Sequence, residues 1–461
     1  MASCEATRYG PFFSILLAML MPGNGAVERV PRSPGLVLAP LLLAAALGIG
    51  AVLAMNDQET LRAGAIMSIL VLVSMVLFWQ VGQADPQGRM LSMLLWVSFG
   101  LKVAAHIFRF QMGLLRDAYA YDSRGRFIAD QLARGMWPEE FGRLGSDVIR
   151  VLTGFAYYWL GVTFNGASVL WLWFGLLGML FFYLAFTTAF LQGHRRLYMV
   201  LVFLYPSMLL WTSSLGKDAL VVMFMGMAAY GAARAQRRIE PIGVWWLLLG
   251  VAGTAVIRPH VAAMFAVAFG TSFLVRPVRA GMFSPVLRLV GLLAAAGLAA
   301  VVVQTAQSYV GLEEIGTQAV LQNIEERQGT ARGGSAFEQV DVSTPAGLAM
   351  AIPTIIFRPF PWEAHNTEAL MASLEGVLLL ALVVSRWRSV IHTVRAARHD
   401  GYALLLVVYV LLFVFFFSSI GNFGILARQR ASQLFPFLFM LIALRGPDTD
   451  RSDRAGAEGV G

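Results

Sequence analysis

Residues 90–112, MLSMLLWVSFGLKVAAHIFRFQM, form one apolar stretch that decides the class of fold. A helix needs about 20 apolar residues to cross the hydrocarbon core of a bilayer, and this stretch has that length. Its ionisable residues are Lys102, His106 and Arg109, at spacings that place all three on one face of a helix. We therefore expect a transmembrane helix with one polar stripe, which would line a polar cavity unless Arg109 simply extends to the membrane surface.

Similar apolar stretches recur along the whole chain. Hydrophobic residues make up 58% of the 461 residues and charged residues 13%, whereas soluble domains are about 25% charged. The composition indicates an integral membrane protein without a separate soluble catalytic domain. We expect an all-α, polytopic bundle of about twelve spans, at residues 36–54, 63–81, 90–112, 167–191, 197–213, 219–236, 242–257, 261–276, 285–305, 367–385, 402–418 and 431–445.

The distribution of arginine orients these spans, because cytoplasmic loops collect basic residues. A cytoplasmic N-terminus places several arginine-containing connections inside: Arg89, Arg195 with Arg196, Arg234 with Arg237 and Arg238, Arg276 with Arg279, and Arg386 with Arg388, Arg395 and Arg398. The same orientation places the acidic 306–345 connection outside. We attribute the net charge of +8 to this bias, and expect no nucleic-acid partner.

The orientation predicts a multi-pass membrane protein with both termini in the cytoplasm. Residues 1–35 would be a cytoplasmic segment with an interfacial helix, 36–445 the transmembrane domain, and 446–461 a disordered cytoplasmic tail. The outer loops would be 113–166, 306–366 and 418–430. Two apolar segments, 148–165 and 346–360, would break the alternation if they crossed, so we expect amphipathic or re-entrant helices on the outer face.

Basic residues in short outer turns run against the positive-inside rule, which indicates a specific partner. Arginine presents a planar fork to phosphate oxygens and lysine a compact charge. The expected ligands of a phosphate or pyrophosphate group are Lys217, Arg258, His260, Arg358, Arg428 and Arg430. The alternative for each arginine is that it caps a helix end or extends to lipid headgroups.

Two carboxylates follow span 90–112 and are the candidate catalytic residues. Asp117 and Asp122 could take a proton from a sugar hydroxyl, or Asp117 could pair with Arg116 or Arg124 on a surface helix. Tyr121, Trp211, Trp362 and His365 are the expected residues of an acceptor or sugar pocket. The histidines show no metal-ligand spacing and the single cysteine excludes a cysteine-based site, so we expect no cofactor, and a divalent metal has no support.

Several of these features resemble the GT-C superfamily of polytopic glycosyltransferases, which use polyprenyl-phosphate-linked sugars at the extracytoplasmic face. They are Asp117 with Tyr121, the 148–165 segment, PSMLLWTSSLGKD at 206–218, and Arg258-Pro-His260. GNFGILARQR at 421–430 resembles O-antigen and exopolysaccharide polymerases. The resemblance implies a GT-C-like fold, Asp117 as the general base, and Lys217 and Arg258 as ligands of the carrier phosphate.

The function expected from the sequence is transfer of a sugar or glycan from a polyprenyl (pyro)phosphate carrier to an acceptor hydroxyl. The partners would be that carrier-linked substrate, membrane lipids and a polysaccharide-biosynthesis complex. One alternative is a transporter or flippase of a lipid-linked or anionic substrate, which predicts internal repeats and charged residues at mid-membrane depth. Another is a non-catalytic membrane protein of envelope assembly.

Overall fold

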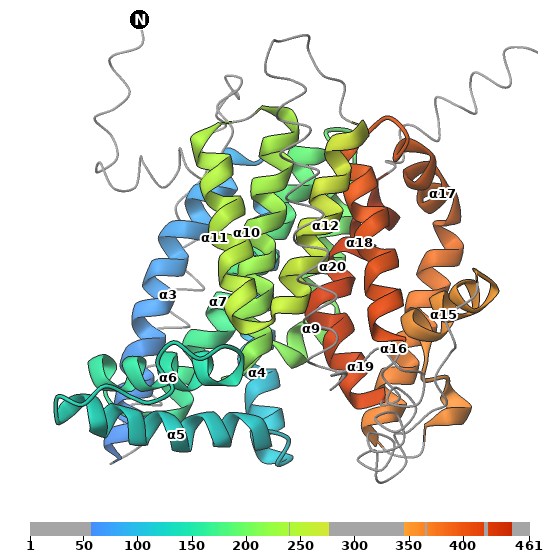
Figure 1. Cartoon of the computed structure of the whole chain (residues 1–461). Coiled ribbons are helices and arrows are strands. Elements are labelled where there is room, and N and C mark those ends of the chain that lie inside the picture. Colours follow the sequence, from blue (N-terminus) through green and yellow to red (C-terminus); the bar gives the residue numbers. More distant parts are fainter. Residues whose placement is uncertain (1–56, 239, 276–344, 365–366, 419–422, 445–461) are drawn as a thin grey trace, which may run out of the picture. The chain divides into compact units, whose positions relative to one another are not determined.

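The structure is a computed structural model that describes residues 57–238, 240–275, 345–364, 367–418 and 423–444 (Figure 1). Within these ranges the chain is helical and contains no strand, which confirms the all-α prediction. The chain divides into two compact units. Unit 1 comprises Met1–Leu180 and Thr212–Leu220, and unit 2 comprises Phe181–Trp211 and Val221–Gly461.

Three of the described helices are long and apolar enough to cross a membrane: α3 (Gln58–Ala84), α4 (Gly88–Gln111) and α7 (Phe164–Ala189). A fourth span results if α16 (Thr367–Ser385) and α17 (Trp387–Ala396), which meet at 68°, are counted as one. The twelve-span bundle and its orientation stay predictions. The predicted segment 1–35, spans 36–54 and 285–305, almost all of the 306–345 connection and the tail 446–461 lie outside the described residues.

In unit 1, α3 and α4 form a helical hairpin whose ends meet closely at Gly82 and Gly88. A Cβ on Gly88 would lie 1.6 Å from the carbonyl oxygen of Gly82, so only glycine allows this approach. The outward side of α3 is apolar, with Ile69 59% and Leu72 58% exposed. Such a surface is expected of a helix that faces lipid.

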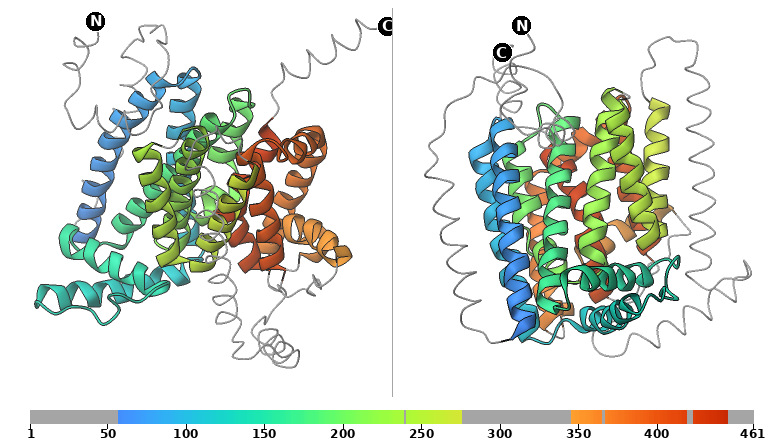
Figure 2. Two further views of the ribbon diagram at one scale, coloured as in Figure 1. Left: turned by 45° about the horizontal axis from the view of Figure 1, so that its top comes forward. Right: turned by 90° about the vertical axis from the view of Figure 1, so that its left-hand side faces the viewer.

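Two shorter helices of unit 1, α5 (Arg116–Ala133) and α6 (Ser146–Leu160), pack against each other and lie across one end of α3 (Figures 1 and 2). Gly125 and Gly154 allow this close packing, because a Cβ on either would meet the facing helix within 2.5 Å. The predicted amphipathic segment 148–165 therefore contains a helix, α6, that lies across the span direction.

Unit 2 contains the C-terminal half of the described chain. Its helices are the bent pair α16 and α17 together with α8 (Arg195–Leu204), α9 (Pro206–Trp211), most of α10 (Lys217–Arg237), α11 (Pro241–Ile257), α12 (Pro259–Val275), α15 (Pro345–Phe357), the 3-10 helix η1 (Pro361–Glu363), α18 (Gly401–Phe417), α19 (Phe423–Gln429), the π-helical segment η2 (Arg430–Leu434) and α20 (Phe435–Ala443). Its core is aromatic, with the rings of Tyr409 on α18 and Phe437 on α20 4.3 Å apart.

The predicted span 197–213 is interrupted in unit 2. α8 ends at Leu204, Tyr205 is extended, and α9 begins at Pro206. Proline has no N–H donor and disfavours a helical conformation in the residue before it, which explains the break.

Candidate functional site

The polar stripe of α4 is buried in unit 1. The exposed fraction is 0% for Lys102, 5% for His106 and 9% for Arg109. Lys102 donates hydrogen bonds to the Thr212 carbonyl oxygen, at 3.1 Å, and to the Thr212 hydroxyl. Arg109 Nη1 donates to the Ser214 hydroxyl at 2.7 Å. The stripe thus packs on the connection that precedes α10.

This connection, residues 212–216, needs such partners because its backbone is not helical and lies among apolar helices. Besides the bonds from the stripe, the Leu215 N–H donates to the Ser168 hydroxyl at 3.4 Å. Gly175 on α7 leaves room for Lys102, since a Cβ there would lie 3.2 Å from the Lys102 Nζ. Among the residues that the structure describes, Lys102 forms no ion pair, and its hydrogen-bond partners are two neutral oxygens of Thr212.

Arg109 also connects this region to the start of α5. Its Nη2 donates to the Leu114 carbonyl oxygen at 3.3 Å. The partners of Arg109 are Leu114 and Ser214. Asp117, in the first turn of α5, comes three residues after Leu114. Lys217, the first residue of α10, comes three residues after Ser214. Arg109 thus links the segments that precede the predicted base and one predicted phosphate ligand. Asp117 is exposed and Lys217 is half-buried.

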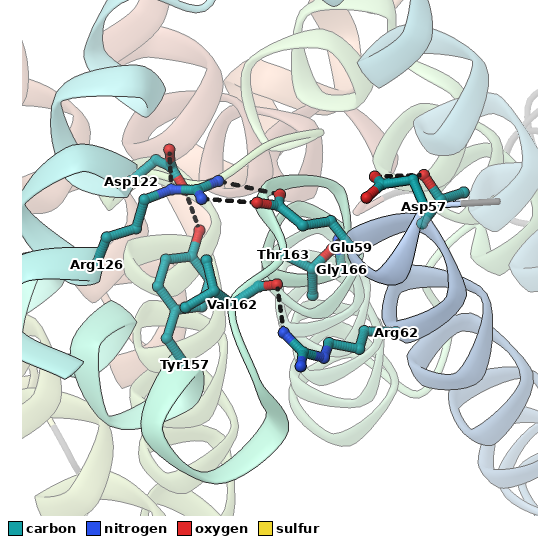
Figure 3. A network of polar contacts seen from close by, with 10 residues as sticks. Asp57, Glu59, Arg62, Asp122, Arg126, Tyr157, Val162, Thr163 and Gly166 are labelled. Atoms are coloured by element: carbon teal, nitrogen blue, oxygen red, sulfur yellow. Dashed lines mark hydrogen bonds and ion pairs between the residues drawn. The ribbon is translucent and has the colours of Figure 1, made fainter. Parts of the chain in front are cut away.

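Asp122 has a different environment, shown in Figure 3. It accepts hydrogen bonds from the Tyr157 hydroxyl and from Arg126 Nε, the latter at 2.9 Å. Arg126 also donates to both carboxylate oxygens of Glu59, at 2.7 and 3.1 Å. Asp122 thus ties α5 to α6 and, through Arg126, to the first turn of α3, and this geometry gives no support to a catalytic role.

Two groups of this network, Arg126 and Tyr157, keep their protons around neutral pH. The hydrogen bonds to Glu59 are the main cause that raises the pKa of the Arg126 guanidinium. Burial, and then the hydrogen bond to Asp122, raises the pKa of the Tyr157 hydroxyl. Both groups therefore keep their protons and their donor roles.

Tyr121, a predicted pocket residue on α5, is buried.

Unit 2 brings together other predicted cations. Arg258, between α11 and α12, is buried and donates to the side-chain oxygen of Gln429 at the end of α19. The same oxygen accepts a hydrogen bond from Gln433. His260 is buried and its ring stacks on Phe416, with centroids 5.2 Å apart. We call Arg258, His260, Gln429 and Gln433 the Arg258 cluster.

Arg430 acts as a cap for α15. Its exposed fraction is 2%, and its Nη1 donates to the carbonyl oxygens of Ile356 and Arg358 at 2.8 and 2.7 Å. A cation at the carbonyl end of a helix satisfies acceptors that have no partner within the helix. This geometry agrees with the alternative expected for each arginine, in which it caps a helix end and does not bind phosphate.

Arg358 pairs with Glu363, with Nε 3.1 Å from Oε2, and its guanidinium lies 5.5 Å from the centre of the Phe423 ring. Burial raises the pKa of Glu363, but hydrogen bonds from Arg358 and from the Phe360 backbone outweigh it and leave the pKa below its usual value. The Glu363 carboxylate is therefore charged at neutral pH.

The remaining predicted residues are scattered. Arg428 is half-buried on α19, Trp211 is half-buried at the end of α9, and Trp362 is 76% exposed. His365 lies outside the described residues. The part of the chain that the structure describes contains no group of three or more histidine, cysteine or acidic side chains that could hold a metal ion.

One half-buried acid is absent from the sequence-based predictions. Glu375, in the middle of α16, accepts hydrogen bonds from the backbone N–H of Ser207, at 2.8 Å, and from its hydroxyl. The Tyr205 hydroxyl donates to the Glu375 carbonyl oxygen at 3.2 Å. An acid inside an apolar run of span length is the signal by which Glu375 could have been found.

Fold and site together define a helical protein with candidate membrane-spanning helices and with buried cations in both units. No family model matches the chain, and comparisons with curated proteins and with solved structures find no match.

Proposed function

We propose that the protein is an integral-membrane glycosyltransferase or polysaccharide polymerase of the bacterial inner membrane. It transfers a sugar or glycan from a polyprenyl (pyro)phosphate carrier to an acceptor hydroxyl on the extracytoplasmic face. The observation that carries the proposal is the pair of hydrogen bonds by which Arg109 joins the start of α5 to the connection before Lys217.

The two residues next to this junction suit the two halves of the reaction. Asp117 is exposed, as a base for a water-soluble acceptor must be, and it takes the proton of the attacking hydroxyl. The hydroxyl oxygen bonds to the anomeric carbon while the bond from that carbon to the carrier phosphate breaks. Lys217 stabilises the charge that develops on the departing phosphate.

The Arg258 cluster of unit 2 is a second candidate for anion binding, because a buried arginine and a buried histidine have amide and aromatic neighbours there. Arg358 and Arg430 are less suited, since an acid and a helix end engage them.

The first test is binding of undecaprenyl phosphate to the full chain in nanodiscs. We expect Lys217→Ala to weaken binding about tenfold or more, because a charge-assisted hydrogen bond contributes about 1.5–3 kcal/mol. Arg134→Ala is the matched control, since Arg134 is an exposed cation at the end of α5 that pairs with Asp130 of the same helix. If both variants bind undecaprenyl phosphate as tightly as the wild type, Lys217 does not bind the carrier phosphate.

A transporter of an anionic lipid-linked substrate is the second candidate function. Glu375 favours it, because this half-buried acid binds the break between α8 and α9, and discontinuous helices of this kind form the sites of transporters. Loss of lipid-linked glycan translocation in proteoliposomes with Glu375→Gln, at unchanged glycan transfer, would support this alternative over the transferase.

A further inference from the structure

The most apolar face of α6 points away from the protein. Val148, Leu152, Phe155 and Trp159 follow one another at spacings of four and three residues and so share one side of the helix. Leu152 is 40% and Trp159 77% exposed, and Val148 and Phe155 are half-buried. A helix on the surface of a soluble protein shows the opposite arrangement, with its apolar side toward the core.

The opposite face of α6 supplies the contacts with α5. Ile149, Thr153 and Tyr157 are buried there, and the Tyr157 hydroxyl donates to Asp122. The packing against α5 is therefore complete without the exposed apolar side chains, and they are left for another partner.

The connection between α5 and α6 extends this apolar surface. The Trp137 ring lies 5.1 Å from the Phe141 ring and 6.4 Å from the Phe155 ring. Trp137 is 69% and Phe141 59% exposed. We call Trp137, Phe141, Val148, Leu152, Phe155 and Trp159 the α6 stripe. A contiguous exposed surface of this kind marks a site of interaction with a protein or a membrane.

The position of the α6 stripe along the axis of α3 indicates which partner the stripe contacts. The segment that follows α6 is held by Arg62, whose Nη1 donates to the Val162 carbonyl oxygen at 3.4 Å, and α5 is held by the pair of Arg126 with Glu59 (Figure 3). Glu59 and Arg62 are the last charged residues before the uncharged part of α3, residues 63–84. The α5–α6 pair thus lies at the level where a membrane-spanning α3 enters the hydrocarbon region.

We propose that the α6 stripe is inserted into the interface of the lipid bilayer, with α5 and α6 parallel to the membrane plane. Amphipathic helices of this type bury their apolar face about 5–10 Å into the boundary between headgroups and acyl chains. Tryptophan side chains favour that boundary, and the stripe has one in the connection and one at the end of α6. This attachment is independent of sugar transfer, and it keeps the start of α5 at the membrane surface.

The test uses the full chain in phosphatidylcholine and phosphatidylglycerol nanodiscs. Replacing Cys4, the only cysteine, by serine gives a background for Leu152→Cys, labelled with a small environment-sensitive fluorophore. We expect lipids with a nitroxide on the upper acyl chain to quench this label severalfold more than iodide in the water. Asp130→Cys is the matched control, because Asp130 is exposed on α5, and its label should be quenched by iodide instead.

Two outcomes would overturn the proposal. Quenching of the Leu152→Cys label by iodide alone would show that the stripe faces water. Protection from both quenchers would show that protein covers it, from this chain or a second copy. Trp159→Cys repeats the measurement at the other end of α6, so that a misfolded first variant does not decide the result.

Discussion

Replacing Gly154 by alanine tests the packing of α5 on α6, which positions the start of α5. A Cβ at Gly154 would lie 2.2 Å from Ile128 Cγ2 and 2.6 Å from Ile128 Cβ. Ile128 is fully buried, and its Cβ is fixed to the backbone of α5, so a change of rotamer cannot remove the overlap. The two helices must separate.

The net effect is the difference between two terms. Overpacking of an interior costs about 1–3 kcal/mol, and the upper end applies because the Ile128 Cβ cannot move aside. Alanine is better than glycine in a helix by about 1 kcal/mol. The helix pair should therefore lose about 2 kcal/mol, which raises its open fraction about thirtyfold.

Hydrogen exchange of the full chain in nanodiscs measures this opening, because local exchange rates follow the free energy of local unfolding. We expect faster exchange in α5 and α6 and unchanged exchange in α4. Gly100→Ala on α4 is the control, since nothing lies within 4 Å of its Cβ and only the helix propensity changes. Unchanged exchange of α5 and α6 in Gly154→Ala would refute the packing that we describe.

Two further predictions concern ion pairs. Because the folded-state pKa of Glu363 is lowered, its charge stabilises the fold above the unfolded pKa of about 4.3 and stops doing so as pH falls through the folded value. The difference in thermal stability between wild type and Glu363→Gln should therefore shrink below about pH 4, and a constant difference would contradict the pairing with Arg358. Arg126→Gln should lower stability by about 1 kcal/mol, since it breaks two partly exposed ion pairs, whereas Arg134→Gln, which breaks an exposed pair, should change it little; equal effects would show that the Arg126 network is not structural.

Much of the helical pattern follows from hydropathy. The predicted span 90–112 corresponds to α4, Gly88–Gln111, because a continuous apolar run is a strong local signal. The predicted continuous span 197–213 is wrong at Pro206, where the helix breaks. The residues on both sides of this proline are apolar, so hydropathy alone joins them into one span. Glu375 was missed for the same reason.

The candidate site was less predictable, because its contacts join distant parts of the chain. The spacing of Lys102, His106 and Arg109 predicts a shared face, but nothing local indicates that Thr212 and Ser214 lie against it. Asp117 and Asp122 are both candidate catalytic residues by their position in the sequence. On a helix with about 100° per residue, five positions place them about 140° apart, so α5 directs them to different surroundings.

The transfer rate of Asp117→Asn tests the proposed function most directly. The assay follows glycan transfer from bacterial polyprenyl-linked glycans by the full chain in nanodiscs, with Asp130→Asn, an exposed acid of the same helix, as control. We predict that Asp117→Asn lowers kcat about 10²- to 10⁴-fold, the contribution typical of a general base, and leaves undecaprenyl phosphate binding unchanged. If the wild-type chain transfers glycan and Asp117→Asn transfers it at the same rate, the account is contradicted.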